Sequence, residues 1–141
     1  MHLTDRIDFD LAKILKNRIY AELHEDRYAA EEVEVTWDNY MGAEKFKKGE
    51  YIEGWPDNIH GRTYFAPTYA EVLDWLFDKG IVIRFDPGYT YALNERVAYY
   101  YKVFNIKEGY MNLLFEETME MSSFGLAMKE IIAKLIKMKL I

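Results

Sequence analysis

The sequence predicts an α+β fold in which helices cover one face of an antiparallel sheet of three to five strands. The first observation is a helix pattern with both ends marked over residues 68–80. The second is a series of alternating patterns and turns over residues 81–118, and the third is an amphipathic helix pattern near the end of the chain. Helices and strands that follow one another in blocks are typical of the α+β class. We therefore expect a helix–strand–meander–helix core over residues 65–141.

The first helix pattern lies between Thr68 and Gly80. Pro67 disfavours helical backbone at the residue before it, so the helix is expected to begin after this proline. Thr68 and Glu71 have the spacing of a capping box. Gly80 suits the left-handed backbone that ends a helix. The apolar positions recur at helical spacing and are Tyr69, Val72, Leu73 and Leu76.

A meander of antiparallel strands is expected after this helix. Asp86–Gly88 predicts a tight turn and Asn105–Gly109 predicts a second one. The last helix is expected to begin at Ser122 and Ser123, whose hydroxyl groups suit a helix N-terminus. The expected strands are Ile81–Phe85, Tyr89–Asn94, Val97–Phe104 and Tyr110–Thr118.

The N-terminal part of the chain is harder to assign. Asp8–Tyr20 predicts a short amphipathic helix with Asp8 as its cap, and Glu32–Asp38 predicts a strand. Residues 39–64 are interrupted by Gly and Pro and predict an irregular loop, whose apolar residues should pack on the domain or on a partner. We predict one domain over residues 1–141, made of an N-terminal helix and acidic segment (1–38), the loop (39–64) and the core (65–141).

Composition excludes several classes of function. The 141 residues include no cysteine, so disulfides, thiolate nucleophiles and Cys-based metal sites are excluded. We expect a cytoplasmic protein, because the N-terminus lacks an apolar signal core and no run approaches the roughly 18 apolar residues of a membrane span. Residues 1–60 hold 14 acidic and 8 basic residues, whereas residues 61–141 hold 10 of each. An acidic chain lacks the attraction that supplies most nucleic-acid affinity, so nucleic acid is an unfavoured partner.

Catalytic and metal-binding patterns are weak. The sequence has neither a G-x-S-x-G elbow nor a glycine-rich phosphate loop. The segment His24-Glu25-Asp26, together with Asp57 and His60, has side chains that suit zinc or iron, but these residues lie in polar segments without a metal-site spacing. A metal-dependent hydrolase built on His24 and His60 is therefore an alternative, and solvated surface is the favoured interpretation. We predict no cofactor and no metal.

A second set of carboxylates lies on one face of the first core helix, at Glu71, Asp74 and Asp78. Such a set could serve acid–base chemistry or hold a divalent cation. Helix capping by Glu71 and an ordinary solvated face for the others is the interpretation we favour.

The density of tyrosines in the strand region is the most informative functional feature. Strand periodicity places Tyr99 and Tyr101 on one face and Tyr100 on the other, so at least one of them faces away from the helices. Exposed aromatic side chains can anchor a protein partner, although strand propensity and cross-strand packing account for most such tyrosines. The candidate binding residues are Trp55, Tyr89, Tyr91, Tyr99, Tyr100 and Tyr101.

The segment Ala66–Leu76 followed by Gly80 and Ile81 resembles a group of small uncharacterised proteins encoded by bacterial prophages and mobile elements. Asp8–Leu15 and the aromatic hairpin before a terminal helix extend this resemblance over about half of the chain. The resemblance implies a mobile-element origin and no particular activity.

We therefore expect a small non-catalytic protein that binds another protein through its aromatic strands or its acidic N-terminal part. One version is an acidic surface that occupies a basic nucleic-acid-binding site on a host protein, and self-association is a further arrangement. The alternative from another class is a nucleic-acid-binding module that uses the strand tyrosines and the lysines of the last helix, Lys129, Lys134, Lys137 and Lys139.

Overall fold

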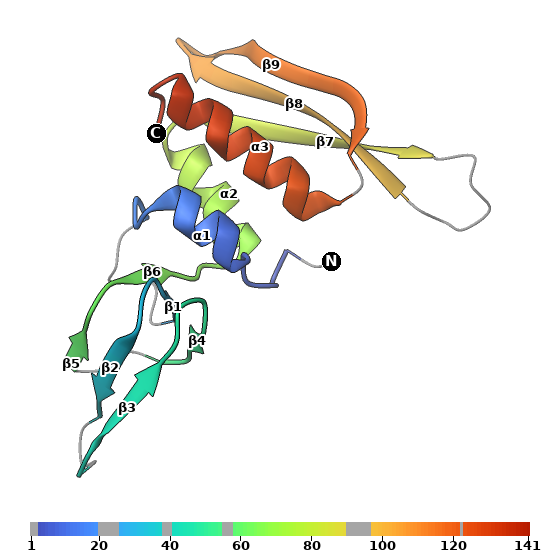
Figure 1. Cartoon of the computed structure of the whole chain (residues 1–141). Helices are drawn as coiled ribbons and strands as arrows, with labels where there is room; N and C mark the ends of the chain where they lie inside the picture. Colours follow the sequence, from blue (N-terminus) through green and yellow to red (C-terminus); the bar gives the residue numbers. More distant parts are fainter. Residues whose placement is uncertain (1–2, 20–25, 38–40, 55–57, 90–96, 122) are drawn as a thin grey trace. The chain divides into compact units, whose positions relative to one another are not determined.

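A computed structural model confirms the α+β class. The structure describes residues 3–19, 26–37, 41–54, 58–89, 97–121 and 123–141, and within these ranges it has three helices and three antiparallel three-stranded sheets (Figure 1). Backbone contacts divide the chain into two compact units. The N-terminal unit is Thr4–Thr68, and the C-terminal unit is Tyr69–Ile141 together with the first three residues.

The described part of the N-terminal unit contains one helix and two small sheets. Helix α1 spans Phe9–Leu15. One sheet has the strand order β4–β1–β6, and its strands are β1 (Arg27–Ala29), β4 (Tyr51–Ile52) and β6 (Thr63–Phe65). The other has the order β3–β2–β5, and its strands are β2 (Val33–Thr36), β3 (Ala43–Phe46) and β5 (Asn58–His60).

The segment 39–64 differs from the predicted irregular loop, because it contains β3, β4, β5 and the first residues of β6. These strands are only two to four residues long, too short for an alternating pattern to stand out. Partly buried Phe46 and Ile59 from this segment pack against a core of Ala29, Val33, Val35 and Ile52. The predicted strand Glu32–Asp38 is confirmed as β2, with its two valines buried.

Helix α1 begins as predicted and ends earlier. The Asp8 carboxylate accepts a hydrogen bond from the Leu11 amide at 2.8 Å, so Asp8 is the N-cap. Lys16 and Asn17 both have positive φ, which ends the helix five residues before Tyr20. The Asn17 side chain then bonds β6, donating to the Thr63 carbonyl and accepting from the Phe65 amide, each at 2.8 Å.

The C-terminal unit has the predicted helix–strand–meander–helix order. Figure 1 shows α3 running along one face of the sheet, and the buried side of α3 includes Met128, Ile131 and Leu135. No helix among the described residues is long and apolar enough to cross a membrane. The elements are α2 (Tyr69–Asp78), β7 (Ile81–Tyr89), β8 (Val97–Lys107), β9 (Tyr110–Met121) and α3 (Phe124–Lys137), and the strand order is β7–β8–β9.

The two predicted turns have different outcomes. The turn at Asp86–Gly88 is wrong, because Pro87 and Gly88 pair with Tyr99 and Ala98 and β7 continues to Tyr89. Proline is tolerated there because β7 is an edge strand. The turn at Asn105–Gly109 is confirmed and is tight, since Lys107 pairs with Tyr110 across Glu108 and Gly109. The φ values of these two residues are +54° and +80°, as a type I′ hairpin turn requires.

Candidate protein-interaction surface

The two faces of the C-terminal sheet differ in what covers them. Tyr101 and Val103 of β8 are fully buried on the side of α3. Successive side chains of a strand point to opposite faces, so Tyr100, Lys102, Phe104 and Ile106 lie on the other face. We call this second face the open face.

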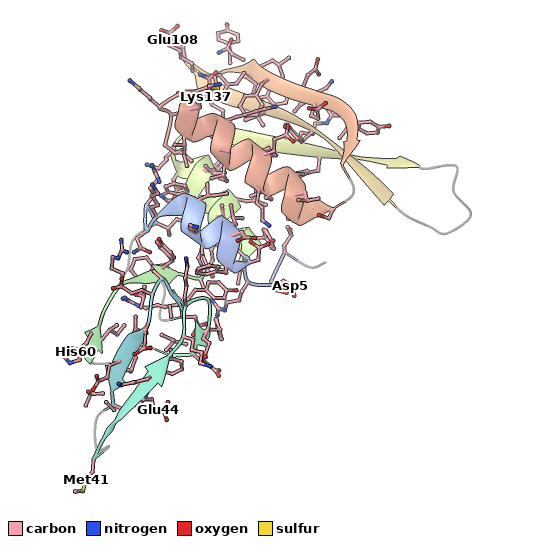
Figure 2. The ribbon with its side chains drawn as sticks, in the orientation of Figure 1. Asp5, Met41, Glu44, His60, Glu108 and Lys137 are labelled. Carbon is pink, nitrogen blue, oxygen red and sulfur yellow. The ribbon has the colours of Figure 1, made fainter. Side chains whose placement is uncertain are left out.

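An apolar patch lies on the open face at the end near the β8–β9 turn, where Figure 2 labels Glu108. Val82, Phe104 and Leu113 face one another across the three strands, and Ile106 faces Met111 in the next row. Ile106, Met111 and Leu113 are 40%, 55% and 51% exposed. Contiguous exposed apolar side chains of this kind mark interaction sites. We call the five residues Val82, Phe104, Ile106, Met111 and Leu113 the open-face patch.

A bulge in β9 creates this patch. Val103 pairs with Phe115, whereas the next residue Phe104 pairs with Leu113, so Leu114 is one extra residue in β9. A bulge shifts the residues beyond it to the opposite face. Phe115 therefore lies on the helix face while Leu113 lies on the open face, although an uninterrupted strand would place both on one side.

Charged side chains border the patch. Lys102 and Glu116 occupy the neighbouring row and form an ion pair at 4.0 Å. Arg84 of β7 is exposed and pairs with Lys102 in the ladder. An apolar centre with a polar rim is the usual anatomy of a protein–protein interface.

The structure describes the predicted binding residues unequally. Trp55 and Tyr91 lie outside the described residues, and for Tyr89 and Tyr99 only the backbone pairings are described. The half-buried Tyr100 lies on the open face, in the ladder position opposite Asp86. The sequence prediction did not include any residue of the open-face patch, and for Met111 and Leu113 of β9 alternation alone does not reveal the bulge.

Tyr101 was predicted as a candidate binding residue, but its side chain is fully buried and is not exposed to a partner. Its hydroxyl group donates to Glu130 Oε1 at 2.6 Å and accepts from Lys134 Nζ at 3.1 Å. Burial and the hydrogen bond to Glu130 raise the pKa of Tyr101 to about 12. The hydroxyl is therefore protonated at neutral pH, and its contacts bind helix α3 to the sheet.

Among the side chains that the structure describes, Tyr100 of β8 and Lys134 of α3 do not lie on one exposed surface. Lys134 is held in an ion pair with Glu130 at 2.9 Å and lies over the Phe115 ring at 5.3 Å. Tyr100 lies on the open face, which is opposite to α3. The exposed Lys137 lies at the end of α3 (Figure 2). The described residues therefore do not show the surface that the nucleic-acid alternative needs, and that alternative stays a prediction.

The residues of the metal alternative are also described in part. His24 and Asp57 lie outside the described residues, and His60 is exposed on β5 (Figure 2). Within the described ranges, no group of three or more His, Cys, Asp or Glu side chains has a geometry that could hold a metal ion.

Asp26, which follows His24 closely in the sequence, has a structural role. Its carboxylate forms an ion pair with Arg6 and accepts a hydrogen bond from the Gly54 amide at 2.8 Å. Burial alone would raise the pKa of Asp26, but the hydrogen bonds from Gly54, Tyr51 and Arg6 outweigh burial and lower it. Burial and the hydrogen bond to Asp26 raise the pKa of Tyr51 to about 12.

Comparisons with known proteins do not extend this description. Neither the family models, nor the curated proteins, nor the solved structures contain a match to this chain. The resemblance to prophage-encoded proteins therefore stays a prediction.

Proposed function

We propose that this chain is a non-catalytic protein-binding module that docks on an apolar surface of a partner protein through the open-face patch. The observation that carries this proposal is the exposure of Ile106, Met111 and Leu113 on the face of the sheet opposite α3. Fully burying an exposed aliphatic side chain of this size contributes about 1.5–3 kcal/mol, and roughly half of that is left to gain for side chains that are 40–55% exposed. Several neighbouring side chains buried together would form the apolar centre of an interface.

The rim supports specificity. Lys102, Glu116 and Arg84 place both signs of charge beside the apolar centre. Charges at a rim discriminate between partners more than they add affinity. The partner is therefore expected to present an apolar centre with charges that complement this rim.

Two observations support a non-catalytic role. The hydroxyl group of Tyr101 and the carboxylate of Asp26 are both engaged in hydrogen bonds that hold the fold together. A tyrosine with a raised pKa is a poor nucleophile and a poor base at neutral pH. The cytoplasmic location and the mobile-element origin remain parts of this proposal that rest on the sequence.

Replacement of Leu113 by Lys tests the proposal. The matched control is Leu126→Lys on α3, because Leu126 is 47% exposed and Leu113 is 51% exposed. The full chain and both variants are immobilised, and proteins retained from a lysate of a native bacterial host are quantified. A retained protein is then purified, and its Kd for each variant is measured by titration.

We expect Leu113→Lys to weaken the complex by roughly tenfold or more, as for a central interface residue, and Leu126→Lys to leave it unchanged. A complex of two copies of this chain that dissociates in Leu113→Lys would identify self-association through the same patch. A partner that binds wild type and Leu113→Lys equally would contradict the proposal.

A further inference from the structure

The β7 edge of the C-terminal sheet has a regular hydrogen-bonding pattern. The β7–β8 ladder pairs nine consecutive residues without a register shift, from Ile81 opposite Asn105 to Tyr89 opposite Val97. Among the described strands, β7 has β8 as its single neighbour. A regular edge strand is a template for pairing with another chain.

The β9 edge is less suited to strand pairing. Its ladder with β8 has two register shifts, between Tyr99 and Tyr101 and between Val103 and Phe104. Bulges twist an edge and interrupt its row of hydrogen-bonding groups, which protects it from strand addition. Pro87 lacks an N–H group and limits the usable part of the β7 edge to Ile81–Asp86.

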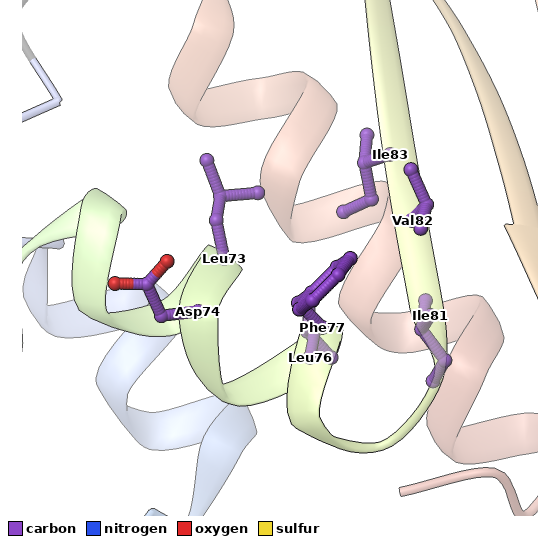
Figure 3. Close-up of a pocket in the computed structure, with 7 residues that line it drawn as sticks. All are labelled: Leu73, Asp74, Leu76, Phe77, Ile81, Val82 and Ile83. Carbon is purple, nitrogen blue, oxygen red and sulfur yellow. The ribbon is translucent and has the colours of Figure 1, made fainter.

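A pocket with a cavity volume of about 210 Å³ lies between α2 and this edge. Figure 3 shows Phe77 of α2 reaching toward Ile83 and Val82 of β7, with Leu73 beside them. Small-molecule sites measure about 300–1,000 Å³, so this pocket has the size for a single aliphatic or aromatic side chain. Phe77 is 60% exposed and lines the pocket, so its ring is accessible to a side chain that enters there.

The charge beside the pocket is negative. Asp74 lines the pocket, and Asp78 lies one helical turn further on the same face of α2. Both side chains are exposed. The Lys79 ammonium group lies over the Trp75 ring, 5.0 Å from its centroid. The two carboxylates therefore favour a cationic side chain on a bound segment.

We propose that the groove between α2 and the β7 edge binds an extended peptide segment that adds a strand to β7, places one aliphatic or aromatic side chain in the pocket, and places a Lys or Arg against Asp74 and Asp78. This mode of recognition derives affinity from main-chain hydrogen bonds and specificity from the side-chain pocket. The inference rests on the proposed function in one respect, that this chain binds protein. It uses a different surface, which shares only Val82 with the open-face patch.

The first experiment identifies a ligand of known sequence. A phage-displayed library of random linear peptides is selected against the full chain. We expect the enriched peptides to share a large apolar residue and a nearby Lys or Arg. Enrichment of peptides without a basic residue, or of peptides that bind as amphipathic helices, would overturn the inference.

The second experiment locates the peptide. A synthetic peptide with the enriched sequence is titrated by fluorescence polarisation against wild type, Phe77→Ala, Asp74→Lys and Leu113→Lys. Phe77 and Asp74 are exposed, so we expect these variants to keep the fold, and circular dichroism of each variant checks this. We expect Phe77→Ala and Asp74→Lys each to weaken peptide binding by roughly tenfold or more, because the first removes the aromatic side chain at the pocket and the second reverses the charge beside it. Binding to Leu113→Lys should be unchanged.

N-methylation of the peptide tests strand addition itself. One peptide amide is methylated at a time. Methylation should abolish binding at every second position of the peptide and leave binding unchanged at the positions between, because alternate residues of a strand bond to the same neighbouring strand. A peptide that is insensitive to methylation would overturn the inference. If Leu113→Lys weakens peptide binding and Phe77→Ala does not, the inference fails, and the open-face patch is the surface that binds the peptide. If Leu113→Lys has no effect on any partner, the proposed function fails separately.

Discussion

The side chain of Tyr101 joins two elements of the C-terminal unit through one hydroxyl group. It donates to Glu130 and accepts from Lys134, both on α3, while its ring lies in β8. The Lys134 ammonium group also lies over the Tyr101 ring at 5.6 Å. Glu130 and Lys134 are four residues apart and bond each other, so the three groups form a closed network. A satisfied polar network in a helix–sheet contact fixes the position of the helix.

Tyr101→Phe is expected to lower the free energy of unfolding by about 1–2 kcal/mol, because hydrogen bonds to charged groups are lost while the Glu130–Lys134 ion pair remains. Urea unfolding monitored by circular dichroism measures this change. Tyr110→Phe is the control, since Tyr110 is 73% exposed, and it should change stability little. If Tyr101→Phe and wild type have the same free energy of unfolding, the hydrogen bonds of Tyr101 make no net contribution to stability.

Local signals of this kind are the part of the fold that the sequence predicts well. The Asp8 cap and the Gly80 stop are confirmed, since Asp8 accepts from the Leu11 amide and Gly80 has a φ of +78°. The Ser123 cap is also confirmed, by its hydrogen bond with the Leu126 amide at 3.1 Å. Each depends on a few neighbouring residues, so the sequence contains the relevant information.

At the scale of elements, strand pairing determines where strands end, which strands are neighbours and where a bulge lies, and local sequence patterns do not predict these features. The dipeptide Pro87-Gly88 favours a turn by itself, but β8 supplies partners for both residues and the strand continues. Strand β1 pairs with β4 and β6, which are distant in the sequence. The β9 bulge at Leu114 exposes Leu113, and it depends on the register with β8. The sequence therefore does not predict that Leu113 lies on the open face.

The β8–β9 turn contains a residue that is poorly suited to its backbone. Glu108 has a φ of +54°, a left-handed conformation that costs most L-residues about 1–2 kcal/mol. Asparagine tolerates this conformation and is favoured before glycine in type I′ turns. Glu108→Asn should therefore raise the free energy of unfolding by about 0.5–1 kcal/mol.

A matched control separates backbone conformation from charge in this turn. Glu108→Gln removes the same charge and keeps the straight side chain, so it should not stabilise the protein. Both variants are compared with wild type by urea unfolding. A stabilisation shared by Asn and Gln would attribute the effect to charge and contradict the conformational explanation.

At the scale of the whole molecule, the two units differ in charge, and each contains a carboxylate that should make its stability depend on pH. Thr4–Thr68 holds 14 acidic and 9 basic residues, so most of the net charge of −6 belongs to the N-terminal unit. Each unit has a carboxylate with a lowered pKa. For Asp26, hydrogen bonds from Gly54, Tyr51 and Arg6 outweigh the opposing effect of burial. For Glu130, hydrogen bonds from Tyr101 and Lys134 lower the pKa.

These lowered pKa values predict how stability depends on pH. The ordinary values are 3.8 for Asp26 and 4.5 for Glu130, and both are lower in the folded protein. The unfolded chain therefore binds protons more readily, and both carboxylates contribute stability above their ordinary pKa values that is lost as the pH falls below them. Wild type should lose stability in this range more steeply than the double variant Asp26→Asn, Glu130→Gln, which cannot take up these protons. Urea unfolding from neutral pH to below 3.8 measures the two slopes, and equal slopes would contradict the assignment of acid sensitivity to these two networks.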